Sequence, residues 1–292
     1  MNGPAHRWID PPPVQVQREV LEYCGDMILA EALARRGVIT LADAQAFLDP
    51  RRRLPTDPTD LPDLCRAADR VEQAIRSGEC IGVWGDFDVD GQTSTALLVS
   101  TLRSLGANVI FHIPVRAHES HGVTVPYLEQ FIHSGAQLVL TCDTGVTAHE
   151  AAAYARAAGV DFLITDHHTL PPELPDACAI VNPQRLPEDH PLRPLCGVGT
   201  AYQLALELLR RAGREPEAAR LLDLVALGTV ADVASLTGAN RDLVQRGLQV
   251  LRDSPRPAVQ ALLRRADVNA GYLSEEHIGF ILAPRFNAVG RL

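Results

Sequence analysis

The sequence predicts an α/β fold: a mostly parallel sheet with helices on both faces, followed by a helical segment. Two observations support this prediction. Short apolar runs at 80–84, 138–140 and 162–164 are typical of buried parallel strands. From residue 63, such runs alternate with stretches of helical spacing, which is the pattern of a parallel sheet covered on both sides.

The N-terminal part, residues 1–62, is expected to be a helical extension and a linker. Apolar residues have helical spacing over 26–36 and 41–48. The stretch 49–62 then contains four prolines and the run Arg51-Arg52-Arg53, which is typical of a connecting loop.

Residues 63–292 are expected to form the main domain, with an α/β part at 63–182 and a helical part at 195–292. The predicted strands are 80–84, 108–113, one ending at 141, one ending at 165, and 179–182. The helices predicted between them are 64–77, 93–105, 125–134 and 147–158. The helical part is expected to contain helices at 199–211, 215–227, 240–252, 257–265 and 274–283.

The composition is that of a globular protein of a reducing compartment. The 292 residues are 46% hydrophobic, and the six cysteines are scattered with no C-x-x-C pair. No apolar segment predicts a secretion signal or a membrane span, so we expect a cytoplasmic protein with no membrane partner. The net charge of −9 argues against a broad basic face for nucleic acid, so extended binding would need a local groove or another domain.

The first polar cluster is Asp86, Asp88 and Asp90, with Gly91 and a helix after it. Carboxylates this close repel one another, and a bound cation is the simplest means of keeping them ionised. A calcium loop of the EF-hand type is excluded because its twelfth position holds Leu97 where Glu is needed. The aspartyl-nucleophile loop of haloacid-dehalogenase-type phosphatases remains an alternative. A helix-capping turn would need only one Asp.

Three more polar clusters follow later apolar runs. Asp143 precedes Thr144 and Gly145, and taken alone it would be an ordinary helix cap. Asp166-His167-His168 ends the next predicted strand, where imidazole can bind a metal and a second ring can face phosphate. Asp232 ends the run 227–231, and taken alone it would be an incidental acid near a helix end.

Together the clusters predict a divalent-metal site, because ligands in open α/β folds collect at the carboxyl ends of strands. Oxygen-rich ligands with one or two imidazoles suit Mn²⁺ or Mg²⁺ better than zinc or copper. Two such ions can activate water and stabilise the oxygens of a displacement at phosphorus. The residue types therefore favour phosphoester hydrolysis, and the sequence has neither an evident Ser-His-Asp arrangement nor a G-x-x-x-x-G-K phosphate loop.

In this order, the clusters resemble the DHH phosphoesterase superfamily, and most closely its RecJ-type branch of single-strand-specific 5′→3′ exonucleases. The resemblance runs from about Ala32 to the last residue and displaces the dehalogenase alternative. Further segments that carry it are 32–37, 47–50, Gly197-Val198-Gly199-Thr200-Ala201, 228–232 with Asn240-Arg241, and 284–291.

The resemblance implies a DHH-type fold and a role for each matching residue. It implies two metal ions, usually Mn²⁺ with Mg²⁺ as the alternative, bridged by Asp143. The implied ligands are Asp86, Asp88, Asp143, His167 and Asp232. Asp90, Asp166 and His168 would lie behind the ligands or face the phosphate. The implied phosphate-binding residues are Arg116, Arg285, Asn287 and Arg291. The implied reaction releases 5′-mononucleotides from single-stranded DNA in repair and recombination.

The sequence also departs from the family pattern. Trp84 stands where many relatives have His, and Glu119-Ser120-His121-Gly122 replaces the family's E-G-Y-G loop. The family's DHH-associated and oligonucleotide-binding domains are not expected within this chain. A protein partner or a separate domain would then supply the contacts that bind DNA. Two alternatives stay open: a phosphodiesterase acting on short oligonucleotides or cyclic dinucleotides, and a non-catalytic replisome-type scaffold.

Overall fold

The computed structural model describes residues 9–116, 118, 119, 121–253 and 256–289. The chain divides into two compact units, the first ending at Pro55 and the second beginning at Thr56. The sequence places this division after residue 62. Leu61 is buried in the core of the second unit, which is why contacts assign the residues just before 62 to that unit.

The first unit is built from three short helices: α1 (Arg18–Cys24), α2 (Met27–Ala34) and α3 (Leu41–Leu48). They pack around Val20, Ala30, Leu33 and Ala44. Two of the three were predicted, and α1 was not. Its only buried residue is Val20 and no side chain caps its start, so it carries almost no periodic signal.

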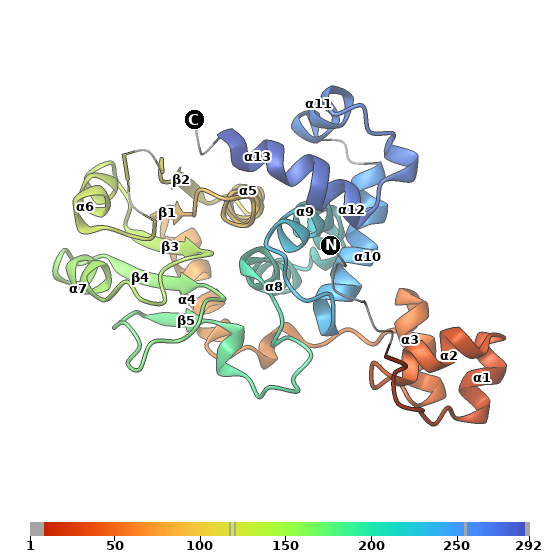
Figure 1. Cartoon of the computed structure of the whole chain (residues 1–292). Coiled ribbons are helices and arrows are strands. Elements are labelled where there is room, and N and C mark those ends of the chain that lie inside the picture. The colour runs from red at the N-terminus through yellow and green to blue at the C-terminus, as the bar shows by residue number, and fades with distance from the viewer. Residues whose placement is uncertain (1–8, 117, 120, 254–255, 290–292) are drawn as a thin grey trace, which may run out of the picture. The chain divides into compact units, whose positions relative to one another are not determined.

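The second unit contains a five-stranded sheet in the order β2-β1-β3-β4-β5, in which every pair is parallel. The strands are β1 (Cys80–Trp84), β2 (Asn108–His112), β3 (Leu138–Cys142), β4 (Asp161–Thr165) and β5 (Ala179–Val181). The predicted parallel α/β architecture is therefore confirmed, and β2 and β5 form the two edges (Figure 1).

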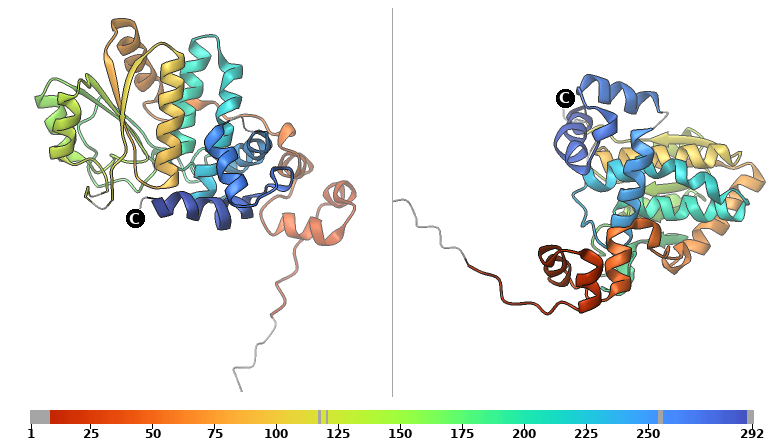
Figure 2. Two further views of the ribbon diagram at one scale, coloured as in Figure 1. Left: turned by 90° about the horizontal axis from the view of Figure 1, so that it is seen from above. Right: turned by 90° about the vertical axis from the view of Figure 1, so that its right-hand side faces the viewer.

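Helices cover both faces of this sheet, as predicted. Strand residues such as Ile81, Leu140 and Leu163 pack in one core with α4 (Leu64–Ser77), α5 (Val89–Ser104) and α8 (Gly197–Arg211). Residues of the opposite face, including Trp84 and Val139, pack with α6 (Val125–His133) and α7 (His149–Ala157). On the first face, α5 and α8 lie side by side (Figure 2).

Helix α5 begins earlier than the sequence predicts. Its first residue is Val89, where the prediction has 93, because Asp88 caps it by accepting a hydrogen bond from the Gly91 N–H at 3.0 Å. Asp90 is therefore in the first turn of the helix, where the backbone N–H groups favour negative charge.

The helical part after the sheet has a core of its own, formed by residues such as Leu227, Val244, Leu263 and Ile278. Its helices are α9 (Leu222–Ala231), α10 (Gly238–Arg252), α11 (Pro257–Arg265), α12 (Glu275–His277) and α13 (Ala283–Val289). A π-helical turn, Ile278–Leu282, connects the last two. Within the described part of the chain, no helix is long and apolar enough to cross a membrane.

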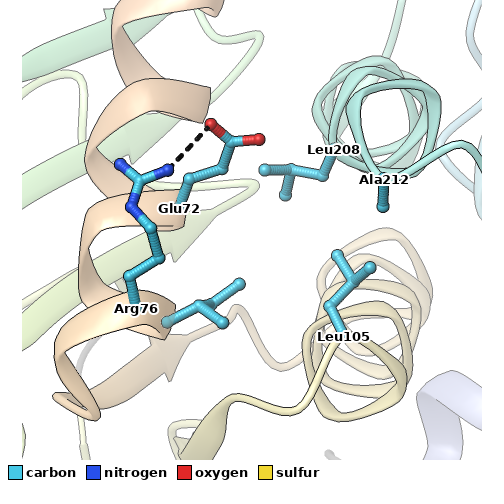
Figure 3. A pocket seen from close by; sticks show the side chains of 6 residues that line it. Glu72, Arg76, Leu105, Leu208 and Ala212 are labelled. Atoms are coloured by element: carbon cyan, nitrogen blue, oxygen red, sulfur yellow. Dashed lines mark ion pairs between the residues drawn. The ribbon is translucent and has the colours of Figure 1, made fainter.

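A small apolar pocket of about 170 Å³ lies between the C-terminal ends of α4, α5 and α8 (Figure 3). Leu105, Leu208 and Ala212 line it, and Glu72 and Arg76 form an ion pair of 3.7 Å beside it. Helix α5 follows the carboxyl end of β1 and runs back along the sheet, so its C-terminal end lies near the amino ends of the strands. The pocket is therefore remote from the polar clusters.

Gly82 tests the packing of α6 on the sheet. A Cβ at this position would lie 2.5 Å from Phe131 Cε1 and 2.9 Å from the Ala136 Cβ. We expect Gly82→Ala to lower the free energy of unfolding by about 1–3 kcal/mol through overpacking. Gly279→Ala is the matched control, because its nearest neighbour would be 3.7 Å away and alanine favours a helix. Equal denaturation midpoints for the two variants would contradict this packing.

Candidate metal centre

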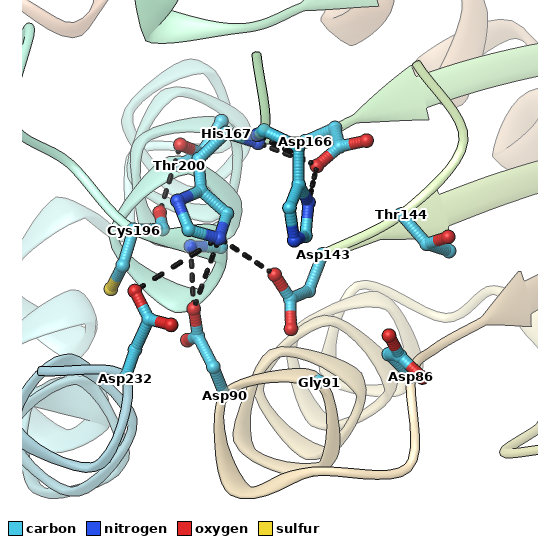
Figure 4. Close-up of polar contacts among 12 residues, drawn as sticks. Asp86, Asp90, Gly91, Asp143, Thr144, Asp166, His167, Cys196, Thr200 and Asp232 are labelled. Atoms are coloured by element: carbon cyan, nitrogen blue, oxygen red, sulfur yellow. Dashed lines mark hydrogen bonds and ion pairs between the residues drawn. The ribbon is translucent and has the colours of Figure 1, made fainter. Parts of the chain in front are cut away.

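The carboxyl ends of the central strands bring most of the predicted polar residues together. Asp86 follows β1, Asp143 follows β3, and Asp166 follows β4. The Asp143 N–H donates to the Thr165 carbonyl and the Asp166 N–H donates to the Val181 carbonyl, both at 3.0 Å. These bonds extend the strand pairing by one residue and bring the two carboxylates together at the carboxyl ends of the strands (Figure 4).

Asp90 joins the start of α5 to the start of α8. One carboxylate oxygen accepts the Gly197 N–H and the other accepts the Val198 N–H, both at 2.7 Å. Its side chain is fully buried. Both helix starts supply positive partial charge, so the pair of bonds is a favourable use of N–H groups that have no partner within a helix.

Asp143 is held in a strained and crowded position. Its φ is +60°, in the left-handed region that residues other than glycine rarely adopt. Gly197 lies against it so closely that a Cβ there would be 2.4 Å from Asp143 Oδ1. That oxygen is buried and has no hydrogen-bond donor of proper geometry among the described residues, although His167 Nε2 lies 3.1 Å away.

Three carboxylates surround His167. Its Nε2 lies 3.1 Å from Asp143 Oδ1, 3.8 Å from Asp90 Oδ2 and 4.0 Å from Asp232 Oδ2. Asp232 is the C-cap of α9, so it reaches the site from the helical part and not from a strand. Figure 4 shows Asp143 between His167 and Asp86.

Asp166 orients His168. Its Oδ1 accepts the backbone N–H groups of His167 and His168 and lies 2.7 Å from His168 Nδ1, while Oδ2 accepts the Val146 N–H at 2.9 Å. Burial alone would raise the pKa of Asp166, but its hydrogen bond to His168, the charge of that ring and these N–H groups lower it. The same hydrogen bond raises the pKa of His168 to about 9, so this half-exposed ring is cationic at neutral pH.

Four other acids of the site are destabilised in their charged form. Burial raises the pKa of Asp90 to about 8, and the charge of Asp232 adds to the rise. Burial, with the charge of Asp88, raises the pKa of Asp232 to about 6. The pKa of Asp143 is well above its usual range because of burial and then the charge of Asp90. Burial also raises the pKa of Asp86.

These observations fit a site for divalent cations. The donors are carboxylate oxygens and one imidazole, which are the ligands that Mn²⁺ and Mg²⁺ prefer. Burial and the charge of His168 lower the pKa of His167 to about 4, so its ring is neutral and can act as a ligand at neutral pH. A cation would give the orphaned Asp143 oxygen a partner and would offset the repulsion among the acids.

Asp86 and Asp88 are tied to their own loop. Asp86 Oδ1 accepts the Phe87 N–H at 2.6 Å, and Asp88 caps α5. Asn287, in α13, reaches the same loop, where its Oδ1 accepts the Val89 N–H at 3.1 Å. The Asn287 amide thus contacts the backbone that carries the two aspartates, a position that its proposed role at the phosphate did not predict.

The predicted phosphate-binding arginines are less closely gathered. The Arg116 guanidinium lies over the Phe87 ring, 5.0 Å from its centroid. Arg285 is exposed and donates to the Ile281 carbonyl at 2.6 Å within its own helical region. Arg291 lies outside the described residues.

Sequence reasoning did not assign a role to three residues at this site. The N–H groups of Gly197 and Val198 hold Asp90, and the only signal for them was the Gly197-Val198-Gly199 segment quoted for the family resemblance. Cys196 lies close to Asp90 and Asp232. Burial raises the pKa of the Cys196 thiol well above its usual range, and the thiol contacts Thr229 Oγ1 at 3.3 Å, so it is a neutral neighbour of the acids.

The raised pKa values predict how stability depends on pH without metal. Asp90 and Asp232 hold protons in the folded state that the unfolded chain has released, because their pKa values of about 8 and about 6 exceed 3.8. His168, with a pKa of about 9 against 6.5, acts in the same direction above pH 6.5. The thermal unfolding midpoint of the metal-free protein should therefore fall from pH 6.5 to 8.

Mn²⁺ should stabilise the protein more at pH 8 than at pH 6.5, because ligands bind it in their ionised form. Asp90→Asn is the control, since it removes one titrating group and should flatten the metal-free profile. A metal-free midpoint that rises across this window would contradict the assignment.

Asn287→Ala tests whether α13 holds the aspartate loop. Losing the acceptor for the Val89 N–H should lower the free energy of unfolding by about 1 kcal/mol and weaken Mn²⁺ binding. Asn269→Ala is a matched control, because Asn269 accepts the Gly271 N–H at 2.9 Å outside the site. Calorimetric titration with Mn²⁺ should separate the two variants; equal Mn²⁺ affinities would show that the Asn287 bond does not support the site.

Comparisons with known proteins identify the family of this chain. The model of the DHH family, N-terminal domain, matches residues 80–229. The single-stranded-DNA-specific exonuclease RecJ of Bacillus subtilis is 40% identical over 91% of this chain, and the RecJ of Escherichia coli is 37% identical over 96%. A crystal structure of exonuclease RecJ bound to manganese superposes with a TM-score of 0.74 at 36% identity, covering 81% of this chain.

The chain spans only part of these relatives. It covers 33% of the Bacillus subtilis protein, 51% of the Escherichia coli protein and 60% of the chain in the crystal structure. The family model nevertheless matches more than half of this chain and includes the strand ends that carry Asp86, Asp143 and His167. The chain therefore belongs to the DHH family.

Proposed function

We propose that this chain is a two-metal phosphodiesterase, and that its reaction is 5′→3′ exonucleolytic hydrolysis of single-stranded DNA with release of 5′-mononucleotides. The observation that carries the proposal is the convergence of the Asp90, Asp143 and Asp232 carboxylates on the Nε2 atom of His167. All three carboxylates lie within 4.0 Å of that atom. A RecJ crystal structure shares this fold, and the RecJ relatives are named single-stranded-DNA-specific exonucleases.

The proposal assigns catalysis to residues 63–292 and the metal ions to a specific set of ligands. Two divalent ions, Mn²⁺ or Mg²⁺, would be held by Asp86, Asp88, Asp143, His167 and Asp232, with Asp143 between them. When bound, such ions supply an activated water and stabilise the charge that develops at phosphorus. The RecJ of the crystal structure is bound to manganese, which supports this choice of cofactor.

The other polar residues would position the substrate and the ligands. Asp90 holds α8 against α5 and so keeps Gly197 beside Asp143. Asp166 orients His168, whose half-exposed cationic ring can donate to a phosphate oxygen. Arg116, over Phe87, and Arg285, on α13, would add positive charge for the substrate phosphates.

Tight binding of long DNA would need contacts beyond those that these residues supply. With a net charge of −9, the protein offers little general attraction for a polyanion. The RecJ relatives are about two to three times longer, so a further domain or a protein partner would supply contacts along the strand. The unpaired cysteines agree with a reducing location, and we infer the cytoplasm.

The same charge favours a second candidate. A protein that attracts polyanions weakly suits short substrates, so hydrolysis of short oligonucleotides or cyclic dinucleotides is the alternative. The chemistry at phosphorus would be unchanged, and only the dependence of the rate on substrate length would differ.

The test is hydrolysis of 5′-phosphorylated single-stranded DNA of several lengths with Mn²⁺. We expect stepwise release of mononucleotides by the wild type. Asp143→Asn should reduce the rate more than about 100-fold, since even residues behind metal ligands are commonly worth 10–100-fold. Asp189→Asn, in an exposed loop, is the matched control and should retain activity.

The outcomes of this assay distinguish the candidate functions. Rates that fall as the strand lengthens, with fast cleavage of dinucleotides, would favour the second candidate. Tight binding of Mn²⁺ with no hydrolysis of any substrate would contradict both activities and would indicate a non-catalytic scaffold with the same fold.

A further inference from the structure

Two aromatic rings join the ends of β1 and β2. Trp84 and His112 are paired in register as the last residues of these neighbouring strands. Their ring centroids lie 4.4 Å apart, and Phe131 packs against both at 5.5 and 6.0 Å. Trp84 is 1% exposed. The Trp84 side chain is therefore part of the hydrophobic core beneath α6, and it fixes the ring of His112 from one side.

Glu119 holds His112 from the other side and closes the following turn. Its Oε2 lies 2.7 Å from His112 Nε2, and its Oε1 accepts the Val115 N–H at 3.3 Å. The N–H groups of His118 and Glu119 both donate to the Val115 carbonyl, at 2.9 and 2.8 Å. The Glu119 side chain is only 10% exposed, so this carboxylate is committed to the turn and does not face solvent.

The turn carries Arg116 to the loop of the metal centre. Arg116 directly follows Val115, and its guanidinium lies 5.0 Å from the centroid of Phe87. Phe87 lies between Asp86 and Asp88 in the sequence. Tyr127 of α6 donates to the His118 carbonyl at 3.1 Å and steadies the far side of the turn. The contacts therefore run from Trp84 through His112 and Glu119 to Val115, the residue that precedes Arg116.

We propose that Glu119 is a positioning residue: through His112 and the Val115 N–H, it fixes Arg116 beside the aspartate loop so that the guanidinium meets a phosphate of the nucleotide substrate. This inference rests on the proposed function and extends it. It gives roles in positioning one side chain to Trp84, where this chain departs from the family pattern, and to Glu119, a residue that the 119–122 segment shares with the family's E-G-Y-G loop. A guanidinium held in advance loses less entropy on binding phosphate than a free one.

A double-mutant cycle on binding tests the proposal. The probe is a 5′-phosphorylated single-stranded oligonucleotide with Ca²⁺ in place of Mn²⁺, so that affinity is measured by fluorescence anisotropy without cleavage. Arg116→Ala and Glu119→Ala should each raise the Kd about 10-fold, the size typical of losing a group that binds or orients a ligand. The double variant should also show about a 10-fold rise, because both changes remove one interaction.

Three controls separate positioning from loss of structure. Glu119→Gln keeps an acceptor for the Val115 N–H and should bind within about 3-fold of the wild type. Glu173→Ala, an exposed carboxylate in another loop, should change nothing. Mn²⁺ affinity should be the same in the wild type and Glu119→Ala, because Glu119 contacts none of the proposed ligands. If Glu119→Ala does not fold, His112→Asn tests the same contact from its other partner.

Failure of this inference and failure of the proposed function give different results. A double variant about 100-fold weaker than wild type would show that the two residues act independently, and would overturn the inference even if the enzyme cleaves DNA. Coupled Kd values without cleavage under Mn²⁺ would support the inference and contradict the nuclease. A wild type that binds no oligonucleotide would overturn both.

Discussion

The hydrogen bonds from Gly197 and Val198 to Asp90 are the contact on which the rest of the centre depends. They join the starts of α5 and α8, and so connect the sheet to the helical part that follows it. Because both helix starts face one buried carboxylate, the two backbones approach closely, and Gly197 comes to lie against Asp143. The same approach brings Cys196 and Asp232 beside Asp90. Without this contact, two buried N–H groups at the start of α8 would lose their acceptor.

That arrangement concentrates negative charge where water is scarce. Burial and mutual repulsion raise the pKa values of Asp86, Asp90, Asp143 and Asp232, and Asp143 also holds a left-handed backbone conformation. Strain and like charges gathered at one place are typical of functional sites, where a ligand compensates them. Asp166 is the exception, since its His168 partner and backbone N–H groups already compensate it. The repulsion among the other acids is therefore not compensated by the fold itself, and a bound divalent cation would compensate it.

The sequence predicted the strands and the residues at their ends well, because buried parallel strands are short apolar runs and their polar ends are local signals. It could not predict that α5 begins at Val89, since that depends on the cap formed by Asp88. The bonds between Asp90 and residues 197 and 198 join positions 107 and 108 apart, and no local pattern indicates such a contact. Taken alone, Asp232 looked incidental in the sequence, because the local pattern does not show which distant residues face a helix C-cap. Asn287 likewise contacts the Val89 N–H, a partner 198 residues away.

We propose that Asp143 lies between two divalent ions. Anomalous X-ray diffraction from crystals of the protein soaked in Mn²⁺ tests it most directly, because manganese can be located without assuming its ligands. We expect two peaks, with Asp143 contacting both, His167 and Asp232 on one side and Asp86 on the other. Peaks elsewhere on the protein, or none at this centre at saturating Mn²⁺, would contradict it.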